Sequence, residues 1–395
     1  MLILGIETSC DETAVAQVQD GRHIITNHIS SSAEIHAATG GIIPEQAARQ
    51  QLKSLLPLLS HTLKQTNLTT KGKGDSDLAR QGELRSVASG GNRRCPPEID
   101  AIAITTGPGL IGSLLVGTET AKALAYLWQK PLIPVNHLIA HIYANWIKTK
   151  ITPGVAERTP LEWNPPTFPA LALVVSGGHT DLVLMKNHDS LKLLGTTRDD
   201  AAGEAFDKTA RILGLPYPGG PALSQLAQKG QDTYHLPRPL SHQPTLDWSF
   251  SGLKTAVYHL ARQENPPLHP ANLAASIEAA ITDILVEKTL QAARKYRPPS
   301  LLLSGGVAAN RRLREKMSLG IGNLSFNINL YIPPPSLCTD NAAIVAAAAY
   351  YHHHPIPWPK VTAHPSLTIT SSMNLFQNSF HEPVSQPSLN LNSNF

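Results

Sequence analysis

The sequence predicts an α/β protein of two similar lobes that face one cleft. Four short apolar runs, at residues 2–6, 101–104, 171–175 and 301–303, each lead into a turn rich in Gly, Ser or Thr, as buried strands of α/β proteins do. The first and third runs are followed by further strand-like residues and predict β-hairpins. The second and fourth are followed by helical patterns. Because the arrangement occurs twice, we expect two related lobes.

Helices are indicated between these strands by periodicity and by residues that start or stop a helix. Gly214 ends one pattern, Pro298 follows another, and Asn341 is among the caps available to a third. A short helix is also expected to open at the glycine-rich segment 218–221. We expect the longer helices at residues 45–63, 112–128, 199–213, 273–296, 310–317 and 340–351.

Two segments interrupt this pattern and a third follows it. Residues 65–97 are polar and Gly-rich, and their six Lys and Arg residues could bind phosphates, although a flexible surface loop is the plainer interpretation. Residues 148–169 are Pro-rich and predict an irregular connection. Residues 362–395 lack periodicity and predict a low-complexity tail that is disordered or loosely attached. The two lobes then comprise residues 1–132 plus 336–361 and residues 133–335.

The composition is that of an ordinary soluble protein. The 395 residues are 42% hydrophobic and 16% charged, and 33 basic against 29 acidic residues leave a net charge of +4, which argues only weakly for a nucleic-acid partner. Cys10, Cys95 and Cys338 have no CxxC spacing, so neither a disulfide framework nor a thiolate zinc site is expected. We see no signal peptide and no apolar run that could span a bilayer, and we expect a cytoplasmic protein without a membrane partner.

The segment at residues 136–141 carries the strongest indication of chemistry. On a helix, residues four apart lie on the same face, so His137 and His141 can converge on one divalent metal. Asn136 is a good N-cap, which would fix the direction of both rings. The competing interpretation is that the two histidines are merely packed or solvated. The motifs that accompany the pair favour the metal.

Asp340 could supply the third ligand of this site. Two histidines and one carboxylate leave coordination positions open for substrate or water, as a catalytic metal requires. Capping its own helix is an equally good interpretation of Asp340. The donor set suits iron and zinc equally well.

A glycine-rich turn follows the apolar run at 171–175. Gly177 and Gly178 have no Cβ and would let backbone N–H groups approach an anion, while the hydroxyls of Ser176 and Thr180 add donors. Such a motif alone usually marks an ordinary turn. As the tip of a hairpin whose counterpart lies at residues 8–13, it predicts a phosphate-binding cleft.

Three more positions could contact a nucleotide. Asp207 lies with Glu204, Lys208 and Arg211 near one helix face, where a carboxylate could bind ribose hydroxyls, although a solvated face with i,i+4 pairs is the simpler interpretation. Gly220 could bring the backbone close to the same ligand, or form a plain turn. Asn310 offers a donor and an acceptor to a base or ribose, with the role of N-cap as an even alternative.

Taken together, these motifs resemble the universal tRNA threonylcarbamoyltransferase family, actin-like proteins once labelled O-sialoglycoprotein endopeptidases. The resemblance runs in order from Met1 to about Tyr350. The matching segments are residues 5–13, 106–109, 136–141, 175–180, 199–208, 217–221, 249–255, 304–310 and 338–343.

The resemblance implies a two-lobed actin/Hsp70/sugar-kinase-like fold with duplicated lobes around a nucleotide cleft. It also implies a reaction, in which a threonylcarbamoyl group passes from threonylcarbamoyl-AMP to the exocyclic amine of the adenosine 3′ of the anticodon. The tRNAs concerned read codons that begin with adenosine. The metal ligands of the family fall on His137, His141 and Asp340. Its adenylate-contacting positions fall on Val174, Val175, Ser176, Gly177, Gly178, Asp207, Gly220 and Asn310.

The resemblance also bears on the catalytic group, the metal and the partners. Glu12, at the tip of the first hairpin, is our choice for an acid/base or orienting residue. One divalent metal is expected, with iron favoured and zinc as the alternative. The expected partners are tRNA, threonylcarbamoyl-AMP, a degenerate actin-like paralogue and a small P-loop ATPase.

Three other functions compete with a threonylcarbamoyltransferase. An actin-fold small-molecule kinase would share the phosphate hairpins, but it needs Mg²⁺ and a general base rather than a pair of histidines. A metalloprotease would need the Glu of H-E-x-x-H, and Leu138 stands in that place beside His137. A non-enzymatic nucleotide-binding scaffold should have lost the histidine pair and Asp340, which this chain retains.

Overall fold

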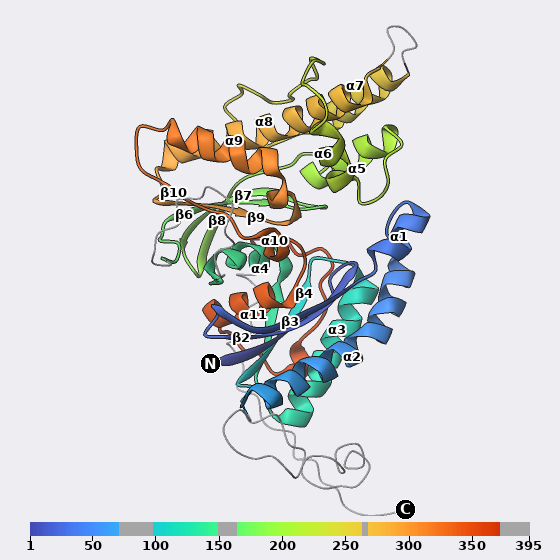
Figure 1. Cartoon of the computed structure of the whole chain (residues 1–395). Coiled ribbons are helices and arrows are strands. Elements are labelled where there is room, and N and C mark those ends of the chain that lie inside the picture. The colour runs from blue at the N-terminus through green and yellow to red at the C-terminus, as the bar shows by residue number, and fades with distance from the viewer. Residues whose placement is uncertain (71–97, 149–163, 263–267, 372–395) are drawn as a thin grey trace, which may run out of the picture.

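The apolar runs of the sequence form the central strands of two five-stranded sheets, one in each of two stacked lobes (Figure 1). The computed structural model describes residues 1–70, 98–148, 164–262 and 268–371. The first sheet contains β1 (Leu2–Glu7), β2 (Glu12–Gln19), β3 (His23–Ser31), β4 (Ala101–Gly107) and β5 (Leu132–Asn136). The second contains β6 (Ala170–Val175), β7 (Thr180–Asn187), β8 (Ser190–Thr196), β9 (Ser300–Ser304) and β10 (Asn329–Tyr331).

The two sheets have the same topology. The strand orders are β3-β2-β1-β4-β5 and β8-β7-β6-β9-β10. In the first sheet, β1 pairs antiparallel with β2 and parallel with β4. In the second, β6 pairs in the same two ways with β7 and β9. The predicted duplication of an α/β lobe is therefore confirmed.

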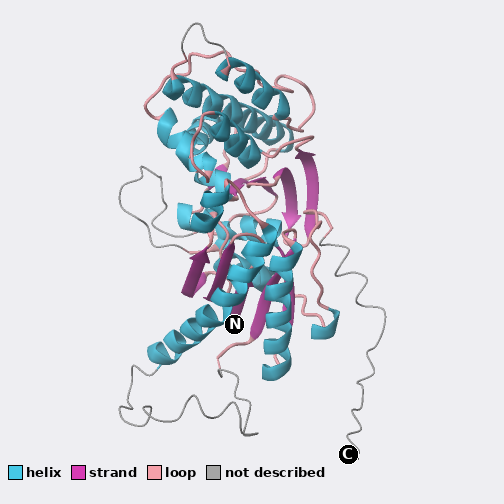
Figure 2. Cartoon of the chain, turned by 90° about the vertical axis from the view of Figure 1, so that its right-hand side faces the viewer, coloured by secondary structure: helices cyan, strands magenta, loops and turns pink. Residues whose placement is uncertain are grey.

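Helices cover both faces of each sheet (Figure 2). In the first lobe, α2 and α3 pack on one face and α11 on the other. The helices of this part of the chain are α1 (Ala33–Thr39), α2 (Pro44–Thr70), α3 (Ile111–Trp128), α4 (His137–Tyr143), η1 (Ala144–Trp146), α11 (Ala342–Tyr351) and η3 (Trp358–Lys360). Those of the second lobe are α5 (Ala202–Ile212), α6 (Gly219–Ala227), α7 (Ser251–Ala261), α8 (Pro270–Tyr296), η2 (Gly306–Ala309), α9 (Arg311–Gly322) and α10 (Pro335–Cys338).

Strand β6 shows how the sequence distributes the core. Side chains alternate between the faces of a strand, so Leu171, Leu173 and Val175 enter the core beneath α8. The smaller Ala170, Ala172 and Val174 face the other way, into a core shared by the two lobes. In β6 the outer face therefore carries larger side chains than the inner face.

The small residues of the inner core let α4 and α11 lie between the two sheets. Six of the ten residues of helix α11 are alanine, its first eight residues are buried, and it packs against β1. A Cβ at Gly5 of β1 would collide with the carbonyl of Ala342, so this glycine permits the close approach. The approach matters because it brings Asp340, just before α11, next to α4.

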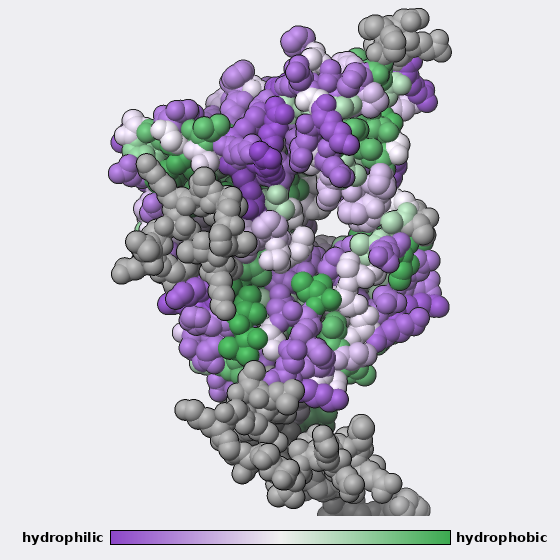
Figure 3. All heavy atoms as spheres, viewed as in Figure 1, coloured by the Kyte–Doolittle hydropathy of each residue, from purple (hydrophilic) through white to green (hydrophobic). Residues whose placement is uncertain are grey.

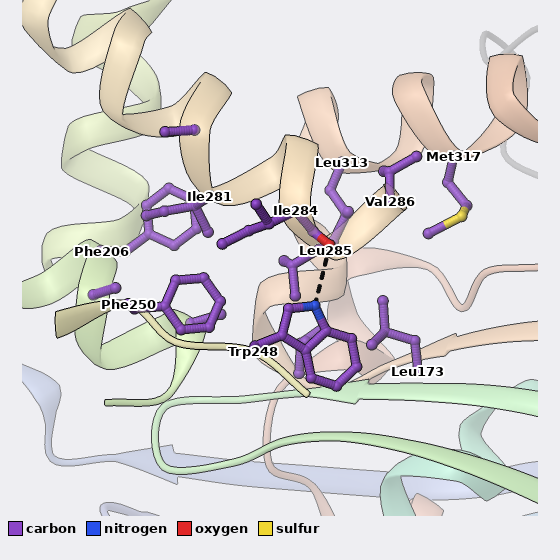
Figure 4. Close-up of a cluster of buried hydrophobic side chains, with 14 of the residues drawn as sticks. Leu173, Phe206, Trp248, Phe250, Ile281, Ile284, Leu285, Val286, Leu313 and Met317 are labelled. Carbon is purple, nitrogen blue, oxygen red and sulfur yellow. Dashed lines mark hydrogen bonds between the residues drawn. The ribbon is translucent and has the colours of Figure 1, made fainter. Parts of the chain in front are cut away.

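The large core of the second lobe fixes the helices that surround the predicted nucleotide site. Trp248 is fully buried beneath α8, and its indole N–H donates to the Ile284 carbonyl at 3.1 Å (Figure 4). Phe206 of α5 and Phe250 pack in the same cluster. A satisfied indole N–H inside an apolar cluster holds the chain between α5 and α7 in one position.

The predicted helices and hairpins are present, with differences of a few residues at most ends. Among the strands that periodicity did not indicate is β3. Only Thr26 of its residues is buried, so the strand carries no apolar alternation for sequence to reveal. The predicted boundary between residues 132 and 133 falls inside β5, which belongs to the first sheet throughout its length.

The expectation of a loosely attached tail is wrong for residues 362–371. Leu367 and Ile369 are buried, and the backbone N–H of His364 donates to the Thr106 carbonyl at 2.7 Å. These two apolar side chains anchor a segment whose average composition is polar. Residues 372–395, and residues 71–97 and 149–163 of the two predicted insertions, lie outside the described residues. Within the described part of the chain, no helix combines the length and the apolar character that crossing a membrane requires.

Candidate active site

Helix α4 holds the histidine pair in the predicted manner. The Asn136 side chain accepts hydrogen bonds from the N–H groups of Leu138 at 2.9 Å and Ile139 at 3.4 Å, so it is the N-cap. All seven residues of α4 are buried between the lobes. The rings of His137 and His141 meet edge to face with centroids 4.6 Å apart. The predicted cap therefore directs both rings to one point.

Asp340 joins the two histidines at that point. The Nε2 atoms of His137 and His141 are 3.2 Å apart, and Oδ1 of Asp340 lies 3.4 Å from the first and 3.2 Å from the second. An ion at the usual ligand distance of about 2 Å can contact all three corners of a triangle of this size. Two imidazoles and one carboxylate also suit a transition metal. The residues present therefore fit a bound metal.

The alternative role of Asp340, as a helix cap, is taken by its neighbour. The side chain of Asn341 accepts from the N–H groups of Ala343 at 3.1 Å and Ile344 at 3.2 Å and so caps α11. Burial alone would raise the pKa of Asp340, but the charge and hydrogen bond of His137 and the hydrogen bond from His141 hold that pKa well below its usual range. Asp340 is thus an ionised carboxylate directed at the imidazoles.

Glu7 supports His137 from behind. Its carboxylate is fully buried at the end of β1, and Oε2 lies 3.1 Å from Nδ1 of His137 and 2.7 Å from the Thr105 hydroxyl. Oε1 accepts from the Ser9 N–H at 2.6 Å. A carboxylate on the far nitrogen of a ligating histidine fixes the tautomer and orientation of the ring. His141 differs, since its Nδ1 is buried without a hydrogen-bond partner among the described residues.

The tip of the first hairpin places more carboxylates beside Asp340. Ligand atoms of Asp11, Glu12 and Asp340 lie within 4.8 Å of one another. Burial, a hydrogen bond with Asp11 and the charges of Asp11 and Asp340 raise the pKa of Glu12 to about 9. Its Oε1 accepts from the Ser31 hydroxyl at 3.0 Å. The raised pKa favours the protonated form of Glu12, which can donate a hydrogen bond.

The second hairpin has an open glycine tip. Gly177 and Gly178 are exposed, and a Cβ built on either would meet no atom within 4 Å. Packing in this structure does not require glycine at these two positions, but an approaching ligand would. Thr180 does not reach the tip, because its buried hydroxyl accepts from the Ala202 N–H at 2.9 Å and so fastens α5 to the hairpin. Val174 and Val175 are fully buried and present only their backbone to the tip.

Helices α5 and α6 bring three of the predicted nucleotide residues together. In the first turn of α5, the N–H groups of Gly203 and Glu204 donate to the carbonyls of Ser176 and Gly177 at 3.2 and 3.1 Å. One turn later, Oδ1 of Asp207 accepts from the Gly220 N–H at 3.1 Å. Asp207 and Gly220 are therefore neighbours beside the hairpin that carries Ser176.

Asn310 contacts Ser224, which lies one turn after Gly220 in α6. Its Oδ1 caps α9 by accepting from the Leu313 N–H at 2.9 Å. Its Nδ2 donates to the Ser224 hydroxyl at 2.9 Å and to Oε1 of the buried Glu278 at 2.7 Å. Of the two predicted roles of Asn310, the structure shows the cap. Both ends of its side-chain amide already have protein partners.

The two halves of the site face each other across the lobes. His179 of the second hairpin has a lowered pKa because of burial and because of the nearby charges of His137 and His141, despite Asp181. Tyr217 is affected by charges from both lobes, since burial and then Asp11 and Asp207 raise the pKa of its phenol. The histidine pair is therefore within electrostatic range of the glycine hairpin as well as in contact with the first hairpin through Glu7.

Residues that sequence reasoning missed include Glu7, His179 and Tyr217. Each lies inside a motif that was recognised, yet none was given a role. A charged residue at the end of an otherwise apolar strand, as in residues 2–7, was a signal for Glu7, because a buried carboxylate needs a partner. The facing of His179 and Tyr217 toward the other lobe depends on tertiary structure.

A glycine hairpin and a cluster of potential metal ligands that face each other across duplicated lobes place this chain among the actin-like nucleotide-cleft proteins. A family model described as "TsaD: tRNA N6-adenosine threonylcarbamoyltransferase" matches residues 23–72 and 94–347. The chain belongs to this family.

Curated relatives agree with the family match. The tRNA N6-adenosine threonylcarbamoyltransferase of Thermomicrobium roseum is 45% identical, with 87% of this chain and 89% of that protein covered. The proteins of the same name from Geobacillus kaustophilus and Dehalococcoides mccartyi are 46% and 48% identical, over 86% and 87% of this chain and 88% and 90% of those proteins. Among solved structures, HypF of T. kodakarensis superposes with a TM-score of 0.54 at 14% identity, covering 89% of this chain and 47% of HypF, which shows a likeness of fold alone.

Proposed function

We propose that this chain transfers a threonylcarbamoyl group from threonylcarbamoyl-AMP to the exocyclic amine of the adenosine 3′ of the anticodon, in tRNAs that read codons beginning with adenosine. The amine nitrogen forms a bond to the carbamoyl carbon, the bond from that carbon to the phosphate oxygen breaks, and AMP leaves while the amine loses a proton. The product is threonylcarbamoyladenosine. Membership of the family supports this reaction.

The observation that carries the proposal is the convergence of His137, His141 and Asp340 opposite the exposed glycine hairpin. A reaction that separates an acyl group from a phosphate needs one region for each part. The glycine tip leaves room for a phosphate to approach backbone N–H groups. The polar cluster between the lobes lies where the acyl end of the same ligand would extend, so the lobes hold the two reacting groups in a fixed orientation.

We assign Val174, Val175, Ser176, Gly177 and Gly178 to the adenylate together with Asp207, Gly220 and Asn310. Asp207 would bind ribose hydroxyls with its carboxylate, and Gly220 would offer close backbone. Asn310 contributes by exchanging one of its present partners, because its amide is fully engaged. Glu12 acts as the acid/base or orienting group, and its raised pKa supports a role as a hydrogen-bond donor near neutral pH.

We propose that His137, His141 and Asp340 hold one divalent metal, with iron favoured and zinc as the alternative. When bound, such an ion would act as a Lewis acid for the carbamoyl carbonyl or hold the threonyl carboxylate. Glu7 keeps His137 in the tautomer that presents Nε2 to the ion. The buried position of α4 excludes water from that side of the cluster.

We also propose a cellular compartment, partners and lobe boundaries for this protein. We assign the protein to the cytoplasm, with a degenerate actin-like paralogue and a small P-loop ATPase as partners in addition to tRNA. The division into residues 1–132 plus 336–361 and residues 133–335 is kept as a proposal with its first boundary moved past β5, because that strand belongs to the first sheet. A small-molecule kinase is disfavoured by the same cluster, because phosphoryl transfer has no use for two histidines beside Asp340.

The test compares wild type with His141→Ala, and uses the exposed His353→Ala as a matched control. Each protein is incubated with tRNA, threonine, bicarbonate, ATP and the other pathway proteins, and digested tRNA is examined by mass spectrometry. We expect no modified adenosine from His141→Ala and a normal amount from His353→Ala. Undiminished product from a folded His141→Ala variant would refute the metal role. Absence of product from wild type would refute the proposed reaction.

A further inference from the structure

A pocket lined by three cations lies on the second lobe, between α5 and α7. It has a cavity volume of about 350 Å³. Its lining residues are Lys208, Arg211, Ile212, Lys254, Thr255 and Tyr258. We call this feature the α5–α7 basic pocket. None of its residues takes part in the reaction proposed above, so its function needs a separate explanation.

The positive charge of this pocket is only partly neutralised. Asp200 faces two of the cations, with Oδ1 at 2.6 Å from Nζ of Lys208 and Oδ2 at 3.7 Å from Nζ of Lys254. Glu204 approaches Lys208 no closer than 3.9 Å. Arg211 forms no ion pair within 4.0 Å among the described residues, and its guanidinium donates to the Gly40 carbonyl at 2.6 Å. Arg211 therefore retains other donors for an anion.

The pocket is a direct extension of the glycine hairpin. The first turn of α5 is bonded to that hairpin, through the N–H of Gly203. At 1.5 Å per residue, Lys208 and Arg211 lie about 8 and 12 Å further along the same helix. Through Gly40, Arg211 also touches the end of α1 in the other lobe. The cations therefore lie where the two lobes meet, beside the site rather than in it.

An aromatic ring accompanies these cations. Tyr258 is 40% exposed, and the guanidinium of Arg262 lies 4.3 Å from the centre of its ring. Exposed aromatic rings beside basic side chains are typical of surfaces that bind unpaired nucleotides, where bases stack on the ring and cations meet the phosphates. Figure 3 shows hydrophilic residues over the middle of the viewed face of this lobe and hydrophobic residues toward the side of α5 and α7.

We propose that the α5–α7 basic pocket binds backbone phosphates of the RNA substrate near the adenosine to be modified, an inference that rests on the proposed function. The cations are spread over two helices, which suits successive phosphates of a strand better than one small anion. Their distance from the glycine hairpin lets the strand lie on the pocket while the target base reaches the cleft. Tyr258 and Arg262 provide a surface for a flanking base.

The experiment uses the double variant Arg211→Ala/Lys254→Ala in the full chain, assayed with the pathway proteins and an unmodified tRNA transcript. Lys208 is left intact because it adjoins Asp207. The matched control is Arg294→Ala/Lys295→Ala, which removes two exposed cations from the far end of α8 in the same lobe. kcat and KM are measured for tRNA and for threonylcarbamoyl-AMP over a range of KCl concentrations.

The pocket variant should raise KM for tRNA about tenfold at physiological salt, because two phosphate contacts are lost. Its plot of log(kcat/KM) against log[KCl] should become shallower by about 1.4, at about 0.7 per lost contact to a single strand. kcat should not change, KM for the adenylate should change far less than KM for tRNA because Arg211 acts on Asp207 only through its charge, and the control variant should match wild type. A change in salt dependence separates lost phosphate contacts from a general loss of folded protein.

Unchanged tRNA kinetics in the pocket variant, with active wild type, would overturn the inference while leaving the proposed function intact. An equal loss in the α8 control would also overturn it, since any surface cation would then serve. Inactive wild type would instead reject the proposed function. Arg211→Ala removes the contact with Gly40, and the double variant could fail to fold for that reason. In that case Lys254→Ala alone should make the salt-dependence plot shallower by about 0.7. Tyr258→Ala should raise KM for tRNA without changing the slope of that plot.

Discussion

The two hairpins that face the active site have the same secondary structure and opposite surroundings. The first, between β1 and β2, has a tip in which Thr8 and Ser9 are buried, and it carries Glu7, Asp11 and Glu12. The second, between β6 and β7, has an exposed neutral tip at Gly177 and Gly178. The two hairpins have the same backbone arrangement, but the residues at their tips make different contacts.

The difference extends to what surrounds each tip. A Cβ at Gly109 or Gly117 would collide with Ser9 or Thr8, so the first hairpin is closely packed against the start of α3. Among the described residues, no atom lies within 4 Å of a Cβ built on Gly177 or Gly178, and the second hairpin is supported from behind by the first turn of α5 and by Gly305, which packs against Val175. A rigid tip suits the support of a metal ligand, whereas an open tip suits a ligand that arrives and leaves. Substitutions in the two hairpins should therefore have different consequences.

The largest effect is expected from Glu7→Gln in the first hairpin. The amide keeps the size of the side chain but no longer accepts from His137 as a charged carboxylate does, so the imidazole loses its fixed orientation. Metal affinity, measured by competition with a chelator, should fall about 10- to 100-fold. KM for threonylcarbamoyl-AMP, measured with the metal at saturating concentration, should stay the same. Unaltered metal affinity would show that the first hairpin does not support the cluster.

A smaller effect is expected from Gly178→Ala in the second hairpin. The new methyl group has free space in this structure, so the melting temperature should not fall, but it would occupy the space through which a phosphate approaches. KM for the adenylate should rise about tenfold, equivalent to one lost hydrogen bond. Gly322→Ala is the matched control, because a Cβ there also meets nothing within 4 Å. Equal kinetics for the two variants would remove the phosphate role from this tip.

The smallest effect is expected from Asp199→Asn, which acts in the second lobe on the contact between the segment before α5 and the start of α7. Burial would raise the pKa of Asp199, but hydrogen bonds from Ser249, Phe250 and Ser251 outweigh it and lower that pKa below 3.8. The variant should lose about 1 kcal/mol of unfolding free energy at pH 7. Because the folded pKa is the lower one, this stability exists above pH 3.8 and disappears as the pH falls through the folded value. Denaturant titrations at a series of pH values from 7 downward would measure it, and a difference that does not shrink as the pH falls below 3.8 would contradict the assignment.

The fold was predictable from local signals because each lobe repeats a strong one. Buried runs such as residues 2–6 and 171–175, each next to a polar or glycine turn, reveal both hairpins without reference to the rest of the chain. Edge strand β3 was not predicted because eight of its nine residues are exposed or only partly buried. The segment at residues 362–371 escaped because two buried apolar residues cannot outweigh a polar composition.

The candidate site was predictable to the extent that a local rule applied. Asn136 was predicted to cap α4, and the spacing of His137 and His141 places both on one helix face whatever the rest of the chain does. Local sequence did not decide which of two roles Asp340 and Asn310 each play. Asp340 is available to the histidine pair because its neighbour Asn341 caps α11. Asn310, for which a cap and a ligand contact were equally good predictions, caps α9.

The sequence by itself determined the duplicated α/β architecture, the glycine tip and the histidine pair, since each depends on residues within a few positions of one another. Only the tertiary structure decided that Asp340 meets imidazoles some two hundred residues away, that Glu7 stands behind His137, and that Arg211 reaches the opposite lobe. The physical reason is that strand and helix patterns reflect local burial and periodicity, whereas contacts between lobes depend on how closely whole elements pack. Here the alanines of α11 and Gly5 of β1 set that distance.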